Sequence, residues 1–405
     1  MTIPNQHRPV TDWATDFDHA DPLWARDPFP IWAELGARCP VAHTDRYGGA
    51  WLPTRFEDIS AIAYDTAHFS SQAVLMTNAR PHVPAPVGPA PPITSDPPFH
   101  QRARRLLLPA FSPRAIAEWE PSIRASCRDL LDGLAGHDIV DGATDYAQHV
   151  PVDVIARMLG LPPGDGELFR RFVQDVVESV FLPADERRAR FESIGSYIDA
   201  AVEDHIADPR DDLIGYLLDV EVDDQKLSPQ HIRGTIELLL IAGVDTTWSS
   251  IGASIWHLAR VADDRHRLID EPDLIPVAIE ELLRAYAPVT MARLVAQEIE
   301  LHGCPMKPGD WVLLPFPAAN RDPAHFSDAD QIVIDRATNP HAAFGLGIHR
   351  CLGSNLARLE LRVAIEEWLT RFPDFELADA GAVTWASGQV RGPRTLPIRI
   401  LASAE

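Results

Sequence analysis

The stretch Phe344-Gly-Leu-Gly-Ile-His-Arg-Cys-Leu-Gly353 places a single cysteine among three glycines. The residues that follow, 354–372, have the apolar spacing of a helix. Glycine lets the backbone turn closely around a side chain, and the start of a helix favours a thiolate. We therefore expect Cys351 to be a ligand, the alternative being an inert cysteine in a glycine-rich turn. A dinucleotide-binding G-x-G-x-x-G does not fit, because Arg350 occupies the third glycine position.

The composition limits the class of protein. The chain has 405 residues, of which 46 % are hydrophobic, enough for a sizeable core. Lys and Arg number 36 against 59 Asp and Glu, and this net charge of −23 argues against a nucleic-acid partner. The four cysteines form no C-x-x-C pair, which argues against a disulfide framework or a paired-cysteine zinc site and favours a reducing compartment.

The ends and apolar runs of the chain favour a cytoplasmic protein. Residues 1–21 are polar and lack the apolar core of a signal peptide, so we expect an N-terminal tail there. The longest apolar run, Leu238–Ala242, is far too short to span a membrane. We therefore expect no membrane partner.

Helical patterns dominate the chain. A Ser-Pro start at Ser228 and the absence of proline until Pro272 predict one long helix over 229–261. Gly243 lies near its centre, in a segment of poor helix formers, which suggests that something approaches the backbone there. The sequence also predicts helices over 100–108, 150–159, 167–180, 188–206, 276–286 and 354–372, strands over 298–301 and 311–314, a coil over 320–340 and short strands within 384–400.

Eight prolines lie between Pro81 and Pro98, so this segment cannot be the interior of a helix. Taken alone, it favours a linker between two domains over an ordered loop above a binding site; the motifs elsewhere in the chain reverse that order.

A lone thiolate suits one axial position of a haem iron. The stretch around Cys351 resembles the haem-ligand loop of the cytochrome P450 superfamily, F-x-x-G-x-x-x-C-x-G, with the histidine typical of bacterial members at His349. The resemblance implies that Cys351 binds the iron of haem b (iron protoporphyrin IX), with Phe344, Gly345 and Gly353 shaping the loop. It also implies a mainly α fold with small β-sheets, in which residues 1–405 form one haem-thiolate domain with a long distal helix over a buried haem.

Two further motifs resemble those of the superfamily. Glu281-Leu-Leu-Arg284 matches E-x-x-R, and the resemblance adds Arg336 as a third, structural member; alone, the pair would be an ordinary surface ion pair. The segment from Ala242 to Thr247 resembles the distal-helix motif. In that motif Ala242 and Gly243 leave room for dioxygen over the iron, while Thr246 and Asp245 deliver protons. The alternative is an ordinary helical stretch with a solvated aspartate.

The haem propionates need cationic or hydrogen-bonding partners. His100 and Arg104 lie one helical turn apart, within Asp96-Pro-Pro-x-His-x-x-x-Arg. By the same resemblance Arg293 and His349 are further partners, although any one of the four could be a surface residue.

The resemblance also indicates where a substrate binds. We expect the pocket to include part of 169–182, with the proline-rich loop, residues 74–98, as a cover near it. A mostly apolar lining suggests an apolar or aromatic small molecule. The expected pocket side chains are Leu239, Ala242, Val289, Thr290 and Val390.

The function implied is a monooxygenase that inserts one atom of O2 into its substrate by hydroxylation or O-dealkylation. A peroxide-driven peroxygenase and a non-catalytic haem-thiolate sensor are the alternatives. Electrons would come from NAD(P)H through a reductase and a ferredoxin or flavodoxin-type donor, since the chain resembles haem domains fused to an FMN and [2Fe–2S] reductase but ends at Glu405 without one. The expected docking residues are Arg102, Arg350, Arg358 and Arg362.

Overall fold

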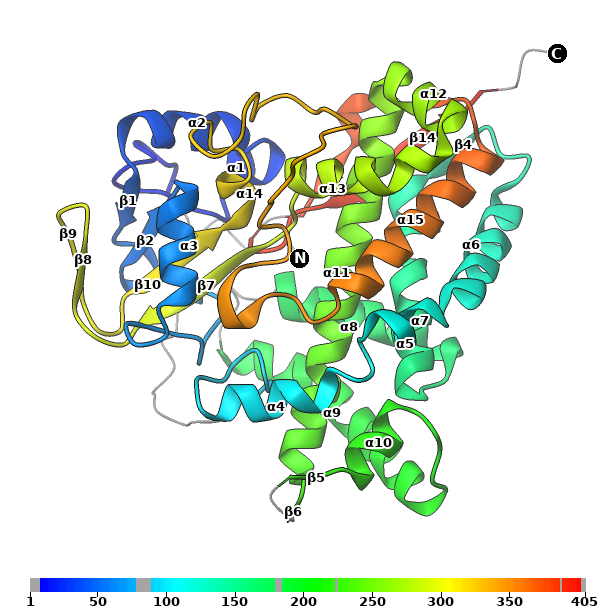
Figure 1. The fold of residues 1–405 in the computed structure, drawn as a ribbon, viewed down its shortest axis with the longest axis horizontal. Helices are drawn as coiled ribbons and strands as arrows, with labels where there is room; N and C mark the ends of the chain where they lie inside the picture. The colour runs from blue at the N-terminus through cyan, green and yellow to red at the C-terminus, as the bar shows by residue number, and fades with distance from the viewer. Residues whose placement is uncertain (1–7, 78–88, 179–183, 223–224, 387, 402–405) are drawn as a thin grey trace.

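The computed structural model describes residues 8–77, 89–178, 184–222, 225–386 and 388–401. Helices dominate this part of the chain and the strands form small sheets, which confirms the predicted fold class (Figure 1). The helices are α1 (Pro22–Arg26), α2 (Phe29–Arg38), α3 (Phe56–Tyr64), α4 (Phe99–Leu107), α5 (Pro113–Ala117), α6 (Glu120–Leu134), α7 (His149–Leu159), α8 (Gly166–Glu178), α9 (Ala184–Ala207), α10 (Leu213–Asp219), α11 (Pro229–Arg260), α12 (Ala262–Asp270), α13 (Ile275–Ala285), α14 (Phe316–Ala319) and α15 (Ser354–Arg371).

Helix α11 runs through the centre of the helical half, with α13 and α15 beside it (Figure 1). Its 32 residues begin as predicted, because the Ser228 side chain accepts a hydrogen bond from the His231 amide and Pro229 occupies the first turn. The helix is long and apolar enough to cross a membrane, but 78 % of its most apolar window is buried inside the protein. It is a core helix, packed also against α7 and α8.

The largest sheet lies in the other half of the molecule (Figure 1). Its central strands are antiparallel, with Leu313 opposite Ala292. The predicted strand 311–314 is confirmed, whereas its partner over 290–295 was not predicted, because that segment lacks the alternation of a half-buried strand. The strand order is β1 (Val41–Thr44), β2 (Ala50–Pro53), β10 (Trp311–Pro315), β7 (Thr290–Val295) and β3 (Phe69–Ser70).

Short strands form the remaining sheets. The predicted strand 298–301 is the first half of a hairpin, and the predicted C-terminal strands pair in two separate sheets. These are β4 (Ile139–Asp141), β14 (Pro397–Ile400) and β11 (Phe375–Leu377) in one sheet, and the pairs β12 (Thr384–Trp385) with β13 (Pro393–Thr395), β8 (Ile299–Leu301) with β9 (Cys304–Met306), and β5 (Glu221–Val222) with β6 (Gln225–Lys226).

The described part of the N-terminal segment is packed and is not a free tail. Phe17 is fully buried in the core beside the large sheet. Asp16 and Asp18 pair with Arg46 at 2.9 and 3.0 Å. The expectation of a tail over 1–21 therefore fails at its end, because buried aspartates meet a cation that lies far along the sequence.

Candidate functional site

The loop before α15 is shaped by backbone hydrogen bonds and two left-handed glycines. The Cys351 amide donates to the Phe344 carbonyl at 2.7 Å, which closes the loop. Gly345 and Gly347 both have φ of +69°, a conformation that other residues rarely adopt. A Cβ at Gly347 would also lie 2.2 Å from the Ala63 carbonyl oxygen of α3. Only glycine therefore lets the loop rest against that helix.

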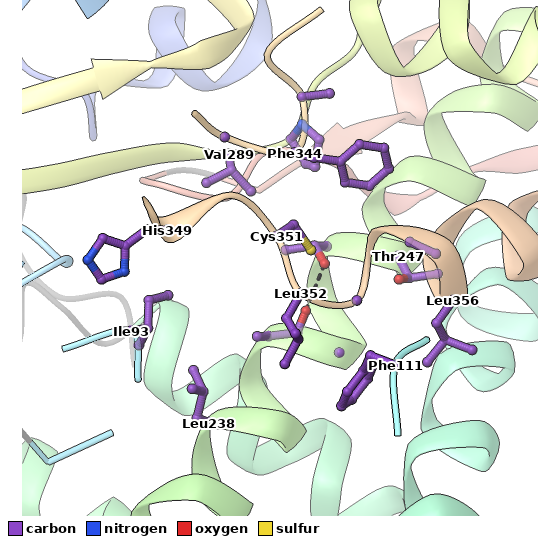
Figure 2. A pocket seen from close by; sticks show the side chains of 18 of the residues that line it. Ile93, Phe111, Leu238, Thr247, Val289, Phe344, His349, Cys351, Leu352 and Leu356 are labelled. Atoms are coloured by element: carbon purple, nitrogen blue, oxygen red, sulfur yellow. Dashed lines mark hydrogen bonds between the residues drawn. The ribbon is translucent and has the colours of Figure 1, made fainter. Parts of the chain in front are cut away.

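Cys351 lies at the floor of a cavity (Figure 2). Burial raises the pKa of its thiol, while the Gly353 amide and the arginines at 104, 350 and 358 act in the opposite direction. The expectation that the loop alone favours the thiolate is not met, because loss of hydration outweighs the helix start. A bound metal would act in the opposite direction to burial, because it deprotonates a coordinating thiol.

The cavity lies between the cysteine loop, α11 and β7. Ile93 and Leu238 stand across from Cys351, with Val289 and Phe344 at the side (Figure 2). Most lining side chains are apolar. Of the predicted site residues, those that line it are Arg104, Leu239, Ala242, Gly243, Thr246, Val289, Arg293, Phe344, Gly345, His349, Cys351 and Gly353.

Two predicted pocket residues lie behind the cavity wall. Val289 and Met291 line the cavity, whereas Thr290, between them, does not, because successive side chains of a strand point to opposite faces. Val390 pairs with Val289 in an isolated antiparallel bridge and is likewise outside the lining. No described residue of 169–182 lines it either. Pro92 and Ile93 do, while residues 78–88 of the proline-rich loop and 179–182 lie outside the described residues.

Three predicted cofactor residues form a cluster, which we call the imidazole–arginine group: the buried His100 and Arg293 and the half-buried His349. The two imidazole rings lie 4.3 Å apart. Both nitrogens of His100 and Nε2 of His349 have no hydrogen-bond partner among the described residues. Arg293 is 4 % exposed and donates to the Ala292 carbonyl. Buried polar groups are almost always hydrogen-bonded, so these atoms indicate a missing polar ligand.

The pKa values in this group indicate the charge of that ligand. Burial lowers the pKa of His100 to about 4 and that of Arg293 to about 10. Burial and then Arg293 lower the pKa of His349 to about 2. An anion beside the three groups would reverse these shifts. The carboxylates of haem fit this place, with Cys351 lining the same cavity.

Arg104, the fourth predicted propionate partner, makes a hydrogen bond to the loop that carries Cys351. Its Nη2 donates to the Arg350 carbonyl at 2.6 Å, while the side chain still lines the cavity. It therefore links α4 to the loop of Cys351.

Glu281, Arg284 and Arg336 meet, and we call them the buried ion cluster. Glu281 and Arg284 are fully buried and make two hydrogen bonds of 2.8 Å. Arg336 Nε donates to Glu281 at 2.9 Å. The alternative interpretation of Glu281 and Arg284 as an ordinary surface ion pair is therefore excluded. Burial raises the pKa of Glu281, but its hydrogen bonds with Arg284 and the other donors prevail, and the net shift is downward.

The rest of this cluster was not predicted. Asn339 Nδ2 and the Val333 amide also donate to Glu281, at 3.1 and 2.9 Å. Arg284 donates to the carbonyls of Asn320, Ala329 and Gln331. The cluster therefore fastens α13 to the coil that leads into the cysteine loop.

At the centre of α11 the two predicted proton-delivery residues face different surroundings. The Thr246 hydroxyl lines the cavity and donates to the Ala242 carbonyl at 2.8 Å. Asp245 is 1 % exposed, lies outside the lining, and pairs with Arg394 of β13 at 2.8 Å. Arg394 also lies 4.4 Å from the centre of the Trp248 ring. The alternative of a solvated aspartate is excluded.

Glu360 is a candidate functional residue that the sequence analysis missed. It lies on α15, lines the cavity and is fully buried. Burial raises its pKa to about 8, against which a hydrogen bond with Thr247 acts, so the surroundings favour the protonated carboxyl. The signal was present, since Glu360 follows Leu356 at an interval of four on an apolar helix face.

The predicted docking arginines are largely ion-paired. Arg358 makes two hydrogen bonds to Glu280, of 2.7 and 2.8 Å. Arg362 pairs with Glu120 at 2.5 Å and with Glu366 at 3.2 Å. Arg102 and Arg350 are exposed.

Comparison with known proteins yields many relatives. The sequence model of the family described as cytochrome P450 matches residues 173–381. Mycinamicin IV hydroxylase/epoxidase of Micromonospora griseorubida is 33 % identical over 86 % of this chain and 89 % of its own. Nocardicin C N-oxygenase of Nocardia uniformis subsp. tsuyamanensis is 34 % identical over 94 % of this chain and 98 % of its own.

The solved structures agree. The cytochrome P450 PksS of the bacillaene polyketide synthase of Bacillus subtilis matches with a TM-score of 0.86 and 29 % identity, over 95 % of this chain and 100 % of its own. The chain therefore belongs to the cytochrome P450 family, whose cofactor is haem b, and is an oxidoreductase of the monooxygenase type.

Proposed function

We propose that residues 1–405 form a single haem-thiolate domain in which Cys351 is the iron ligand. The observation that carries this is the position of Cys351 at the floor of the cavity, with the orphaned nitrogens of His100 and His349 close to Arg293. These three side chains and Arg104 would hold the propionates, while Phe344, Gly345 and Gly353 shape the loop around the sulfur. Haem on a cysteine thiolate supplies dioxygen activation, which no side chain of the chain can perform.

The direct test is spectroscopic. Reduced protein with carbon monoxide should show the strongly red-shifted Soret band of thiolate ligation, and Cys351→Ser should abolish that band. Cys127→Ser is the matched control, because Cys127 is a buried cysteine that lies outside the cavity. A wild-type protein without the band, or a Cys351→Ser spectrum equal to that of wild type, would refute the assignment.

We propose that Thr246 holds water over the cavity and that Asp245 passes protons to it. Asp245 pairs with Arg394, so the relay requires that pair to loosen. Thr246→Ala should lower the product formed per NADH by about tenfold or more, with hydrogen peroxide released instead. Ser254→Ala is the control, since the Ser254 hydroxyl makes the same bond to the carbonyl four residues earlier, outside the cavity. Equal yields in the two variants would remove Thr246 from proton delivery.

The peroxygenase and sensor alternatives are separated by the oxidant used. Turnover should require O2, NAD(P)H, a reductase and a ferredoxin or flavodoxin-type donor. Equal turnover with hydrogen peroxide alone would favour the peroxygenase. No turnover with either oxidant, despite substrate-induced spectral shifts, would favour the sensor.

We propose an apolar or aromatic small molecule as the substrate, modified by hydroxylation or O-dealkylation. Support comes from the apolar side chains that line the cavity, which include Ile93, Leu238 and Val289. The relatives named above carry out hydroxylation, epoxidation and N-oxygenation. Soret-shift titration with aromatic acids, aromatic ethers, terpenes and fatty acids tests the assignment, and binding restricted to charged polar compounds would contradict it.

We further propose a cytoplasmic protein, without membrane or nucleic-acid partners, whose electron donor docks on the side of the cysteine loop. Because Arg358 and Arg362 are ion-paired and Arg350 is exposed next to Cys351, Arg350 should contribute most, with Arg102 as a further docking residue. At low salt, Arg350→Glu should slow electron transfer by about threefold to tenfold, and Arg362→Glu should do so less. Equal rates for Arg350→Glu and wild type would move the docking site elsewhere.

A further inference from the structure

A buried glutamine stands directly behind one wall of the cavity. Gln389 follows Gly388, which has φ of +92°, in the turn between β12 and β13. Only 3 % of it is exposed. Its amide is therefore removed from water, and its donors and acceptor must be satisfied inside the protein.

The side chain of Gln389 joins two segments that are far apart in the sequence. Its Nε2 donates to the Val74 carbonyl at 3.0 Å and to the Thr290 carbonyl at 2.8 Å. Its Oε1 accepts a hydrogen bond from the Met76 amide. Both donors and the acceptor of one amide are thus used, and all three partners are backbone groups.

Backbone hydrogen bonds tie the same segments together. The Thr290 amide donates to the Gln389 carbonyl at 2.8 Å, and the Ala292 amide donates to the Val74 carbonyl at 2.9 Å. Thr290 and Ala292 alternate along β7 with Val289, Met291 and Arg293, which line the cavity. Gln389 therefore lies along the edge of the strand segment whose one face lines the cavity.

We propose that Gln389 is a positioning residue that sets the shape of the substrate cavity without touching the substrate. By holding residues 74–76 against β7, it fixes where Val289 and Met291 stand. This inference rests on the proposed haem function, because the cavity above Cys351 is the one whose shape it sets.

Two small ligands of the haem iron can distinguish a change in cavity shape from a change in access to the iron. Imidazole is small, whereas 4-phenylimidazole carries a ring that must fit between the cavity walls. Gln389→Leu leaves the Thr290 carbonyl and the Met76 amide without that partner. It should weaken 4-phenylimidazole binding, measured by the Soret shift, by about tenfold, with imidazole changed less than about twofold. Thr395→Val, which removes hydrogen bonds to Ala382 and Thr384 at the far end of the same hairpin, should change the affinity of neither ligand.

A second variant keeps the test decisive if the leucine variant folds poorly. Gln389→Glu places a carboxylate against two carbonyl oxygens, so its pKa is raised, and its protonated form regains one donor. Protonation of the ligand affects both proteins alike, so each variant affinity is divided by the wild-type affinity at the same pH. This ratio for 4-phenylimidazole should approach one at pH 5.5 and fall at pH 8.

The possible failures are distinguishable. Equal changes for the two ligands in Gln389→Leu, or a Gln389→Glu affinity that follows the wild-type pH profile, would overturn the role of Gln389. A wild-type protein that shows no Soret shift with imidazole would overturn the proposed haem function and, with it, this inference.

Discussion

The buried ion cluster and the imidazole–arginine group are both charged or polar, and both are largely buried, yet only one is satisfied by the chain itself. Glu281 accepts hydrogen bonds from Arg284, Arg336, Asn339 and the Val333 amide. The ring nitrogens of His100, by contrast, meet no hydrogen-bond partner among the described residues.

The difference separates structure from ligand binding. A buried charge that is fully paired within the chain has a role in the fold, and removing one partner leaves an uncompensated charge. A buried polar group without a partner costs free energy until something else supplies one. The same residue types can therefore serve the fold or bind a ligand, and their hydrogen-bond partners distinguish the two roles.

The largest effect is expected for Glu281→Leu. It would leave Arg284 and Arg336 buried without their carboxylate, at a cost of about 3–5 kcal/mol in the free energy of unfolding. Urea unfolding and the yield of haem-loaded protein measure this. Glu120→Leu, which breaks half-exposed pairs with Arg124 and Arg362, should cost less than about 1 kcal/mol. Equal losses in the two variants would erase the distinction between the ion cluster and a surface pair.

A smaller effect, confined to cofactor retention, is expected for Arg293→Leu. Transfer of haem to an acceptor apoprotein should accelerate by about tenfold. The unfolding midpoint of the haem-free chain should stay level or rise, because a buried cation is removed. Arg371→Leu, at an exposed ion pair with Asp132, serves as the control. If Arg293→Leu destabilised the haem-free chain as much as Glu281→Leu does, the role of Arg293 would be to stabilise the fold and not to bind the cofactor.

The smallest effect is the pH dependence set by His100. Its pKa is about 4 in the folded chain, below the ordinary value of 6.5. Between these values the unfolded chain binds the proton and the folded chain does not, so stability of the haem-free chain falls as pH drops from about 6.5 towards 4. The haem propionates would raise the pKa of His100 in the folded protein, so the haem-loaded protein should lose less stability over this pH range. Urea midpoints at pH 7.5 and 5 measure this, and His100→Phe should flatten the haem-free profile. Parallel profiles with and without haem would show that no anion approaches His100.

The sequence predicted features that depend on neighbours along the chain. The cap at Ser228, the glycines around Cys351 and the helical spacing of His100 and Arg104 are local, and the structure contains each of them. Partners distant in sequence were not predictable. Asp245 meets Arg394, and Gln389 meets Val74 and Thr290, only because strands and turns converge in three dimensions.

The register of β7 shows the same limit. Thr290 was expected in the pocket beside Val289, but a strand sends neighbouring side chains to opposite faces, and 290–295 had not been recognised as a strand. Glu360 was overlooked for a related reason, because nothing in its local sequence shows that the apolar face of α15 meets a cavity.

Gly347 packs against the Ala63 carbonyl, so the loop that carries Cys351 is in direct contact with α3, which lies much earlier in the sequence. That loop thus takes part of its support from the N-terminal half of the chain. A substitution that displaced α3 would therefore be expected to disturb the surroundings of Cys351 from a distance in sequence.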